Sequence, residues 1–143
     1  MIYDFMLEIC DILNISVPKI SFDTSNFTSD TMQAQMDSFG ETIYLRSNKL
    51  NVDLCFFISH ELRHLWQMTY DYELYLSDYK PREQCSSLEE YNLQIAEIDA
   101  NAFAGLVMIE FFHLKPLFNG LPDNVKEIIY KKMEELEATE FNS

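Results

Sequence analysis

The segment HELRH, residues 60–64, constrains this chain more than any other because it places two imidazoles and a carboxylate within five residues. His60 and His64, four residues apart on an α-helix, lie one turn apart on the same face and can bind one metal ion. Glu61 borders the same cleft and can act as a base towards water. The apolar run before the motif, residues 54–58, favours a buried helix. A buried helix should not carry these polar groups unless a partner satisfies them, whereas a surface helix could carry them by chance.

A zinc site needs a third protein ligand, and the predicted helix that follows Ser86 and Ser87 offers Glu97. Either serine, with a glutamate three residues later, makes a capping box that begins this helix. Lys115-Pro116 should end it near His113. The sequence therefore predicts one long helix that supplies the third ligand.

On such a helix, at about 100° per residue, Glu90 and Asn101 fall within about 40° of Glu97, on a polar strip of a mostly apolar helix. Asp99 falls about 200° away, on what we expect to be the solvent side. The motif histidines are the obvious partners for the polar strip. Asn101 could accept the second ring N–H of a ligating histidine, although a local hydrogen bond on the helix explains it equally well. We expect one Zn²⁺ bound by Glu97 and the two histidines.

Taken together, the two motifs resemble those of the ImmA/IrrE-type metallopeptidases, a gluzincin-like family. EIDANAFA, residues 97–104, is similar to the family's Glu-x-Glu/Asp-Ala-Asn/Asp-x-Phe-Ala, and residues 43–45 resemble its edge strand. The resemblance covers roughly residues 15–112. It implies that Glu97 is the third zinc ligand and Glu61 the general base of a metalloprotease. It also implies cleavage of a helix-turn-helix repressor, often encoded beside the protease in prophages, mobile elements or stress operons.

The chain departs from this family pattern in three places. Arg63 stands where the family usually has a small residue, and Trp66-Gln67 follows the motif. The spacer between the motifs, residues 65–96, is somewhat long and contains the tyrosine-rich residues 70–75. Since no fused DNA-binding domain is visible, we expect specificity to come from the cleft, the edge strand and this tyrosine-rich segment.

Peptide cleavage also requires a donor for the negative oxygen of the transition state. Four side chains are candidates, and spacing does not rank them: Tyr70, Tyr72, Tyr91 and Arg63. An extended substrate could pair with the strand expected around residues 42–45 and so place its carbonyl over the metal.

The composition is typical of one small cytoplasmic domain, residues 1–143, because 48% hydrophobic residues provide enough apolar surface for a core. A net charge of −14 argues against nucleic-acid binding and suits a basic protein partner, although it serves solubility equally well. The three widely spaced cysteines are typical of reduced core thiols. The sequence has neither a signal peptide nor an apolar run near the ~20 residues that span a bilayer, so we expect no membrane partner.

The remaining periodicities predict an α+β fold. The order is consistent with a zincin-like arrangement, in which a small antiparallel sheet packs on the HExxH helix, with a long ligand helix and flanking helices. Asn48 or Asn51 should cap the motif helix. The expected elements are a helix at 2–13, strands within 17–22, 32–36 and 41–46, a turn at 39–40, and a last helix from about 121 to 136.

Three other interpretations remain open. The chain could be a catalytically weak relative, in which zinc is structural and the protein serves as an interaction module of a phage or mobile element. Such a site is usually closed by four protein ligands, and the sequence offers no firm fourth. The chain could also be a hydrolase of another substrate class, or an interaction protein without a metal. A neighbouring helix-turn-helix gene would favour the peptidase.

Overall fold

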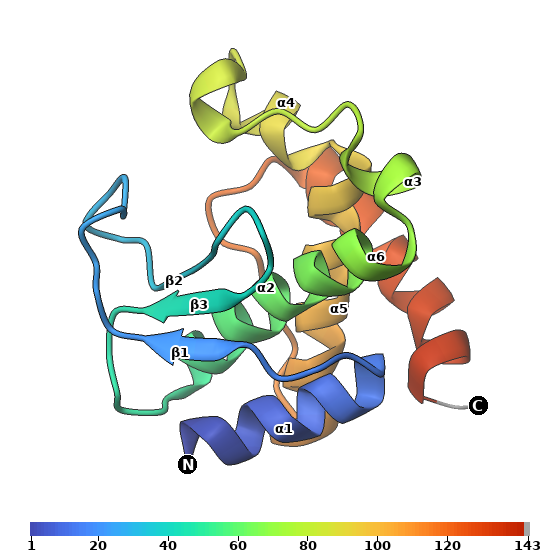
Figure 1. Cartoon of the computed structure of the whole chain (residues 1–143). Coiled ribbons are helices and arrows are strands. Elements are labelled where there is room, and N and C mark those ends of the chain that lie inside the picture. The colour runs from blue at the N-terminus through green and yellow to red at the C-terminus, as the bar shows by residue number, and fades with distance from the viewer. Residues whose placement is uncertain (142–143) are drawn as a thin grey trace.

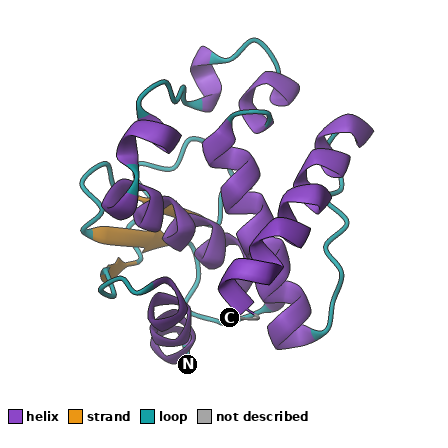
Figure 2. Cartoon of the chain, turned by 90° about the vertical axis from the view of Figure 1, so that its right-hand side faces the viewer, coloured by secondary structure: helices purple, strands orange, loops and turns teal. Residues whose placement is uncertain are grey.

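The computed structural model describes residues 1–141 and has the predicted α+β class (Figure 1). Helices account for most of the described chain, and the small sheet lies to one side of them (Figure 2). In chain order the elements are α1 (Ile2–Leu13), β1 (Lys19–Ser21), β2 (Ala34–Met36), β3 (Thr42–Leu45), α2 (Val52–Tyr70), α3 (Tyr72–Leu76), the 3-10 turn η1 (Arg82–Gln84), α4 (Leu88–Asn92), α5 (Ile95–Phe112), α6 (Asp123–Leu136) and the π-helical turn η2 (Glu137–Phe141).

The sheet is mixed, so the prediction of an antiparallel sheet is wrong for one of its two pairings. The strand order is β1-β3-β2, with β1 parallel and β2 antiparallel to β3. Alternating apolar residues indicate which face of a strand is buried, but they do not indicate its direction. The long connection of residues 22–33 carries the chain past the position of β3. As a result β3 has a neighbour on both sides, so the prediction of an edge strand at residues 43–45 is wrong, and β1 and β2 are the edges of the sheet.

The turn between β2 and β3 depends on a glycine. Gly40 has a φ of 71°, and a Cβ at this position would lie 2.7 Å from Cδ1 of Leu65 on α2. Only glycine adopts this left-handed backbone freely and also allows so close an approach. The glycine therefore permits the β2–β3 turn to lie directly against the motif helix.

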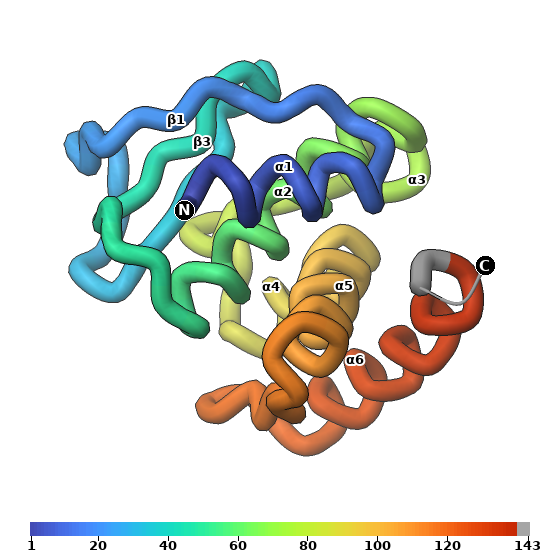
Figure 3. The backbone as a smooth tube through the Cα atoms, turned by 90° about the horizontal axis from the view of Figure 1, so that it is seen from below, coloured from blue at the N-terminus to red at the C-terminus, as the bar shows by residue number. Residues whose placement is uncertain are grey.

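The hydrophobic core lies between α2, α5 and the elements that cover them. α5 packs against α2 on one side and α6 on the other, while α1 lies against α2 (Figure 3). Fully buried side chains come from each of these layers, including Met6, Ile43, Ile58, Phe103 and Ile129. The helix predicted at residues 2–13 is confirmed, because the apolar positions of α1 face this core.

The predicted single helix from Ser87 to His113 is interrupted, and this prediction is wrong in its middle. Ser87 does cap α4, since its hydroxyl accepts from the N–H of Glu90. The chain then leaves the helix at Leu93 and Gln94, where Gln94 is extended. The Gln94 side chain bonds both backbone groups of Lys80, at 2.8 and 2.9 Å. This tertiary clamp, invisible in the local sequence, favours the break.

Other end signals are confirmed. Asn51, one of the two predicted caps, accepts a 2.8 Å hydrogen bond from Leu54 N–H at the start of α2. α5 ends at His113, whose backbone is left-handed, and α6 begins directly after Pro122. All three cysteines are buried and unpaired, as expected for core thiols.

None of the described helices combines the length and the apolar character that a membrane span requires.

Candidate metal centre

Three side chains from two helices converge as the sequence predicts. His60 and His64 come from α2 and Glu97 from the first turn of α5, and their ligand atoms all lie within 4.8 Å of one another. The two Nε2 atoms are 3.1 Å apart. Glu97 Oε1 lies 3.4 Å from His60 Nε2, and Glu97 Oε2 lies 2.8 Å from His64 Nε2.

These distances fit a metal ion. Ligand atoms 2.0–2.1 Å from a tetrahedral zinc lie roughly 3.3 Å from one another, close to the separations seen here. Two Nε2 atoms at contact distance also cannot both present lone pairs to each other without a proton or a cation between them. The donor set of two imidazoles and one carboxylate can therefore hold a metal ion.

The electrostatics of the metal-free cluster follow from burial and mutual attraction. Burial alone would raise the pKa of Glu97, but the charges of His64 and His60 and their hydrogen bonds outweigh it and hold that pKa well below its ordinary value. Burial opposes protonation of His64, yet Glu97 and, more weakly, Glu61 raise the pKa of His64 to about 9. A bound cation would replace the proton in this arrangement.

Glu61 lies beside the three ligands and is not one of them. Burial raises the pKa of its carboxyl group, against the opposing effect of the charges of His64 and His60 and of a backbone hydrogen bond from Met36. A carboxylate whose pKa is shifted towards neutrality and which borders a metal site has the properties of a general base.

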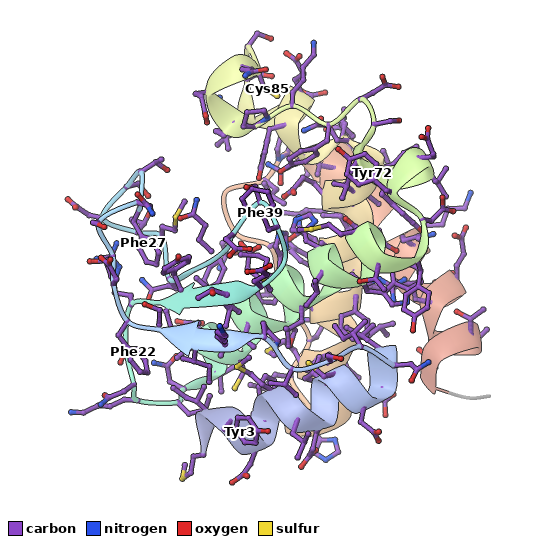
Figure 4. All side chains as sticks on the ribbon, in the orientation of Figure 1. Tyr3, Phe22, Phe27, Phe39, Tyr72 and Cys85 are labelled. Carbon is purple, nitrogen blue, oxygen red and sulfur yellow. The ribbon has the colours of Figure 1, made fainter. Side chains whose placement is uncertain are left out.

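The cluster opens into a cleft of about 750 Å³ between β2 and the segment from α3 to α4. The cleft is lined by His60, Glu61 and His64, by Gln35, Met36 and Asp37 of the β2 region, and by Tyr72, Leu76, Tyr79 and Tyr91 opposite. Tyr72, and Phe39 at the β2–β3 turn, lie on the same side of the molecule, above α2 (Figure 4). The metal group thus lies at the floor of an open groove.

The four predicted oxyanion donors do not share one place. Tyr72 and Tyr91 line the cleft. Tyr70 instead donates a hydrogen bond to the Asn14 carbonyl, away from the cluster. Arg63 is 1% exposed and points into the protein, so it is not available to a substrate. The structure therefore reduces the predicted set to the two tyrosines of the cleft.

Sequence reasoning missed Tyr79, which contacts the cluster directly. Its hydroxyl donates to Glu97 Oε2 at 2.9 Å and lies 3.0 Å from the hydroxyl of Tyr91. Burial first, and then the negative charge of Glu97, raise the pKa of both phenols, so both remain protonated donors. Tyr79 lies in a loop without periodicity, and no sequence signal could have selected it from the other tyrosines.

The predicted role of Asn101 is not seen. Asn101 donates a long 3.5 Å hydrogen bond to Asn92, and the buried Nδ1 of His60 has no hydrogen-bond partner within residues 1–141. Gln67, which sequence reasoning also missed, is the residue that contacts a ligand: its Oε1 lies 2.8 Å from His64 Nδ1. Its spacing, one turn beyond His64, was the available signal.

Asp99 contradicts the expectation of a solvent-exposed side. It is fully buried and forms a bidentate ion pair with Arg63. Arg63 Nε lies 2.7 Å from Asp99 Oδ2, and a terminal guanidinium nitrogen of Arg63 lies 3.1 Å from Asp99 Oδ1. α5 is enclosed on nearly every side, and Asp99, like Glu97, meets side chains of α2 rather than water. Arg63, which differs from the pattern of the family that the motifs resemble, is thus paired with a buried carboxylate.

A second cavity of about 580 Å³ lies between the start of α2 and the α5–α6 connection. Its walls are mainly apolar, with Phe56, Phe57 and Met108, and Asn101 belongs to this cavity rather than to the metal cleft.

The chain matches no protein-family model, no curated protein and no solved structure.

Proposed function

We propose that this chain is a zinc-dependent peptidase with a zincin-like arrangement, in which His60, His64 and Glu97 hold the metal and Glu61 is the catalytic base. The single observation that carries the proposal is the convergence of three metal-ligand atoms at the floor of an open cleft. The sheet beside the motif helix and the crossing ligand helix are consistent with it.

The ligand chemistry favours zinc. Two histidines and one carboxylate, with a position left open towards a cleft, are typical of catalytic rather than structural zinc sites. When bound, zinc supplies Lewis-acid chemistry that lowers the pKa of water towards ~7 and polarises a carbonyl. A structural site would need a fourth protein ligand, and the metal-ligand group found within residues 1–141 contains three.

Glu61 would perform the proton transfers. Its carboxyl group lines the cleft beside the ligands and can accept a proton from the attacking water and pass it to the leaving amine. Tyr91 is a protonated phenol at the same cleft and is the best-placed donor for the oxyanion, because Tyr79 donates its single O–H proton to Glu97.

The free edge of β2, not β3, would receive an extended substrate. The backbones of residues 33 and 37 bond to Arg46 and Thr42, so alternation directs the backbone groups of Ala34 and Met36 to the outer edge, where Met36 also bonds to Glu61 through its backbone. Gln35 lines the same cleft, and its buried Oε1 has no partner among the described residues. A peptide added to this edge runs past Glu61 and the metal.

The proposed substrate is a basic regulatory protein, such as a helix-turn-helix repressor, in the cytoplasm. The net charge of −14 would attract a basic partner. A cleft beside a strand edge selects an exposed extended segment over general proteolysis.

Metal content tests the site first. The purified wild-type protein, equilibrated with zinc and gently desalted, should retain about one Zn²⁺ per chain, and Glu97→Ala should retain far less. A wild-type content under ~0.2, no different from Glu97→Ala, would remove the zinc site from the proposal.

Glu61→Gln separates the metal from the chemistry. This variant should keep its fold and its zinc but lose cleavage by at least about 100-fold, because the amide cannot act as a base. The assay is incubation of zinc-loaded protein with the product of a neighbouring repressor gene, with casein as the control. One discrete, metal-dependent cut supports the proposal, whereas efficient casein digestion contradicts its specificity. Zinc binding without cutting of any candidate would indicate a zinc-binding interaction module.

A further inference from the structure

A chain of buried hydrogen bonds leads from the proposed metal ligand His64 into the core. His64 Nδ1 lies 2.8 Å from Gln67 Oε1, and Gln67 Nε2 lies 2.9 Å from Asp99 Oδ2. Arg63 Nε donates to the same carboxylate oxygen at 2.7 Å. Gln67, Asp99 and Arg63 are each at most 1% exposed, so water does not compete for these bonds.

The two acceptors around Gln67 determine the orientation of its amide. Gln67 Nε2 donates to Asp99 Oδ2 and also to the Ala96 carbonyl, at 3.0 Å. A flipped amide would place its oxygen against two other acceptors, the Asp99 carboxylate and the Ala96 carbonyl, and this repulsion is costly in a buried position. The amide oxygen must therefore face His64. Because that oxygen only accepts, His64 Nδ1 carries the proton and its Nε2 faces the cluster.

The ion pair anchors this arrangement. Arg63 holds Asp99 through two donors and lies over the Trp66 ring, with its guanidinium carbon 3.6 Å from the ring centroid. The two parallel hydrogen bonds from the guanidinium limit the rotation of the Asp99 carboxylate, and the carboxylate in turn limits the orientation of the Gln67 amide. A glutamine is suited to this position because a single side chain must donate on one side and accept on the other.

We propose that Gln67, held by Asp99 and Arg63, is a positioning residue that keeps the proton of His64 on Nδ1 and directs its Nε2 to the metal. This inference rests on the proposed metal site and adds to it the residue that sets one ligand's tautomer. Such partners of a ligating histidine typically change metal affinity by about 10–100-fold when removed.

Two substitutions of Gln67 separate its two roles. Gln67→Met removes both the acceptor for His64 and the donors to Asp99 and Ala96. Gln67→Glu keeps an acceptor but loses the donors and places a carboxylate beside Asp99. We expect Gln67→Met to weaken zinc binding by about 10–100-fold, and Gln67→Glu to keep affinity within about threefold of wild type while lowering the melting temperature. Ser59→Ala, which removes another buried hydrogen bond of α2, should leave zinc affinity unchanged.

The readouts are chelator competition for zinc affinity and ¹⁵N-histidine NMR for the His64 Nδ1 proton, in metal-free and zinc-loaded protein. The chain has three histidines, so the spectrum is readily assigned. Wild type should show a slowly exchanging Nδ1 proton in both states, which Gln67→Met loses and Gln67→Glu retains. Affinities that fall in parallel with melting temperature in both variants would overturn the inference.

The wild-type spectrum tests the inference even if a variant does not fold. A zinc-loaded His64 that lacks a protected Nδ1 proton would refute the assigned tautomer. A wild-type protein that shows the protected proton but binds no zinc would refute the proposed function instead, so the two failures are distinguishable.

Discussion

Two polar clusters lie at the same α2–α5 interface, and they are built in opposite ways. The cluster of His60, His64 and Glu97 opens to a cleft and holds groups that crowd one another. The cluster of Arg63 and Asp99 is sealed from solvent, and its positive guanidinium is paired with a negative carboxylate. Buried polar groups are normally satisfied by protein partners, as in the sealed cluster. The polar atoms of the open cluster need a proton or a bound cation between them, and this need indicates a metal-binding site.

The largest expected effect is on the sealed cluster. Asp99→Asn should lower the free energy of unfolding by about 3–5 kcal/mol, because the buried guanidinium of Arg63 loses its two hydrogen bonds to a carboxylate and cannot lose its proton. Urea unfolding measures the loss. The double variant Arg63→Met/Asp99→Asn, which removes the buried guanidinium together with its carboxylate, should recover much of it. Glu97→Gln, at the open cluster, should cost metal-free protein less, because His64 can lose its proton, whereas Arg63 cannot. A similar loss for Glu97→Gln would invalidate the contrast.

Zinc should stabilise the open cluster selectively. At a hundredfold excess over the dissociation constant, a ligand that binds only the folded state adds about 3 kcal/mol to the free energy of unfolding. We expect this gain in wild type and in Ser59→Ala, reversed by a chelator, and its absence in Glu97→Ala. A gain that persists in Glu97→Ala would place the metal elsewhere.

The pH dependence of the metal-free protein should come from the open cluster. The pKa of His64 is about 9 in the folded state and exceeds its ordinary 6.5. Its contribution to the free energy of unfolding is therefore complete below pH 6.5 and is lost as the pH rises towards 9. The raised pKa of Glu61 acts in the same direction. Glu97 has a lowered pKa, so it stabilises the folded state above about pH 4.5, and this stabilisation is lost as the pH falls.

Metal-free protein should therefore be most stable between about pH 4.5 and 6.5 and lose on the order of 1 kcal/mol by pH 9. Chemical denaturation across this range measures the curve. His64 is faced by Glu97, Glu61, His60 and Tyr79, and zinc should remove the alkaline loss by replacing the proton. An unchanged slope in His64→Ala would show that another group is responsible.

The smallest effect concerns the hydroxyl that sequence reasoning missed. Tyr79→Phe removes the hydrogen bond to Glu97 and should weaken zinc binding by up to about tenfold, with a stability change of about 1 kcal/mol. Tyr70→Phe is the matched control, because it also removes one hydroxyl bond to the protein, but at Asn14. Equal zinc affinity in the two variants would remove Tyr79 from the site.

The candidate ligands were predictable because helical spacing is local. His60 and His64 share a face through their four-residue separation alone, and Glu97 was selected as a carboxylate on an apolar helix. The surroundings of these ligands were not predictable. Asp99 was assigned to solvent because an angle on a helix does not say what packs against each side. Tyr79 and the break at Gln94 depend on contacts between segments that are separated in the sequence.

The sequence by itself determined the helix that carries the motif, the apolar faces that bury it, and the residue types able to bind a metal, since these follow from periodicity and side-chain chemistry. Only the tertiary structure decided the direction of β1, the free edge at β2 and the pairing of Arg63 with Asp99. It also decided which amide contacts His64. Each of these depends on how separate elements meet in space, and hydrogen bonds and burial at such meetings have no local signature in the chain.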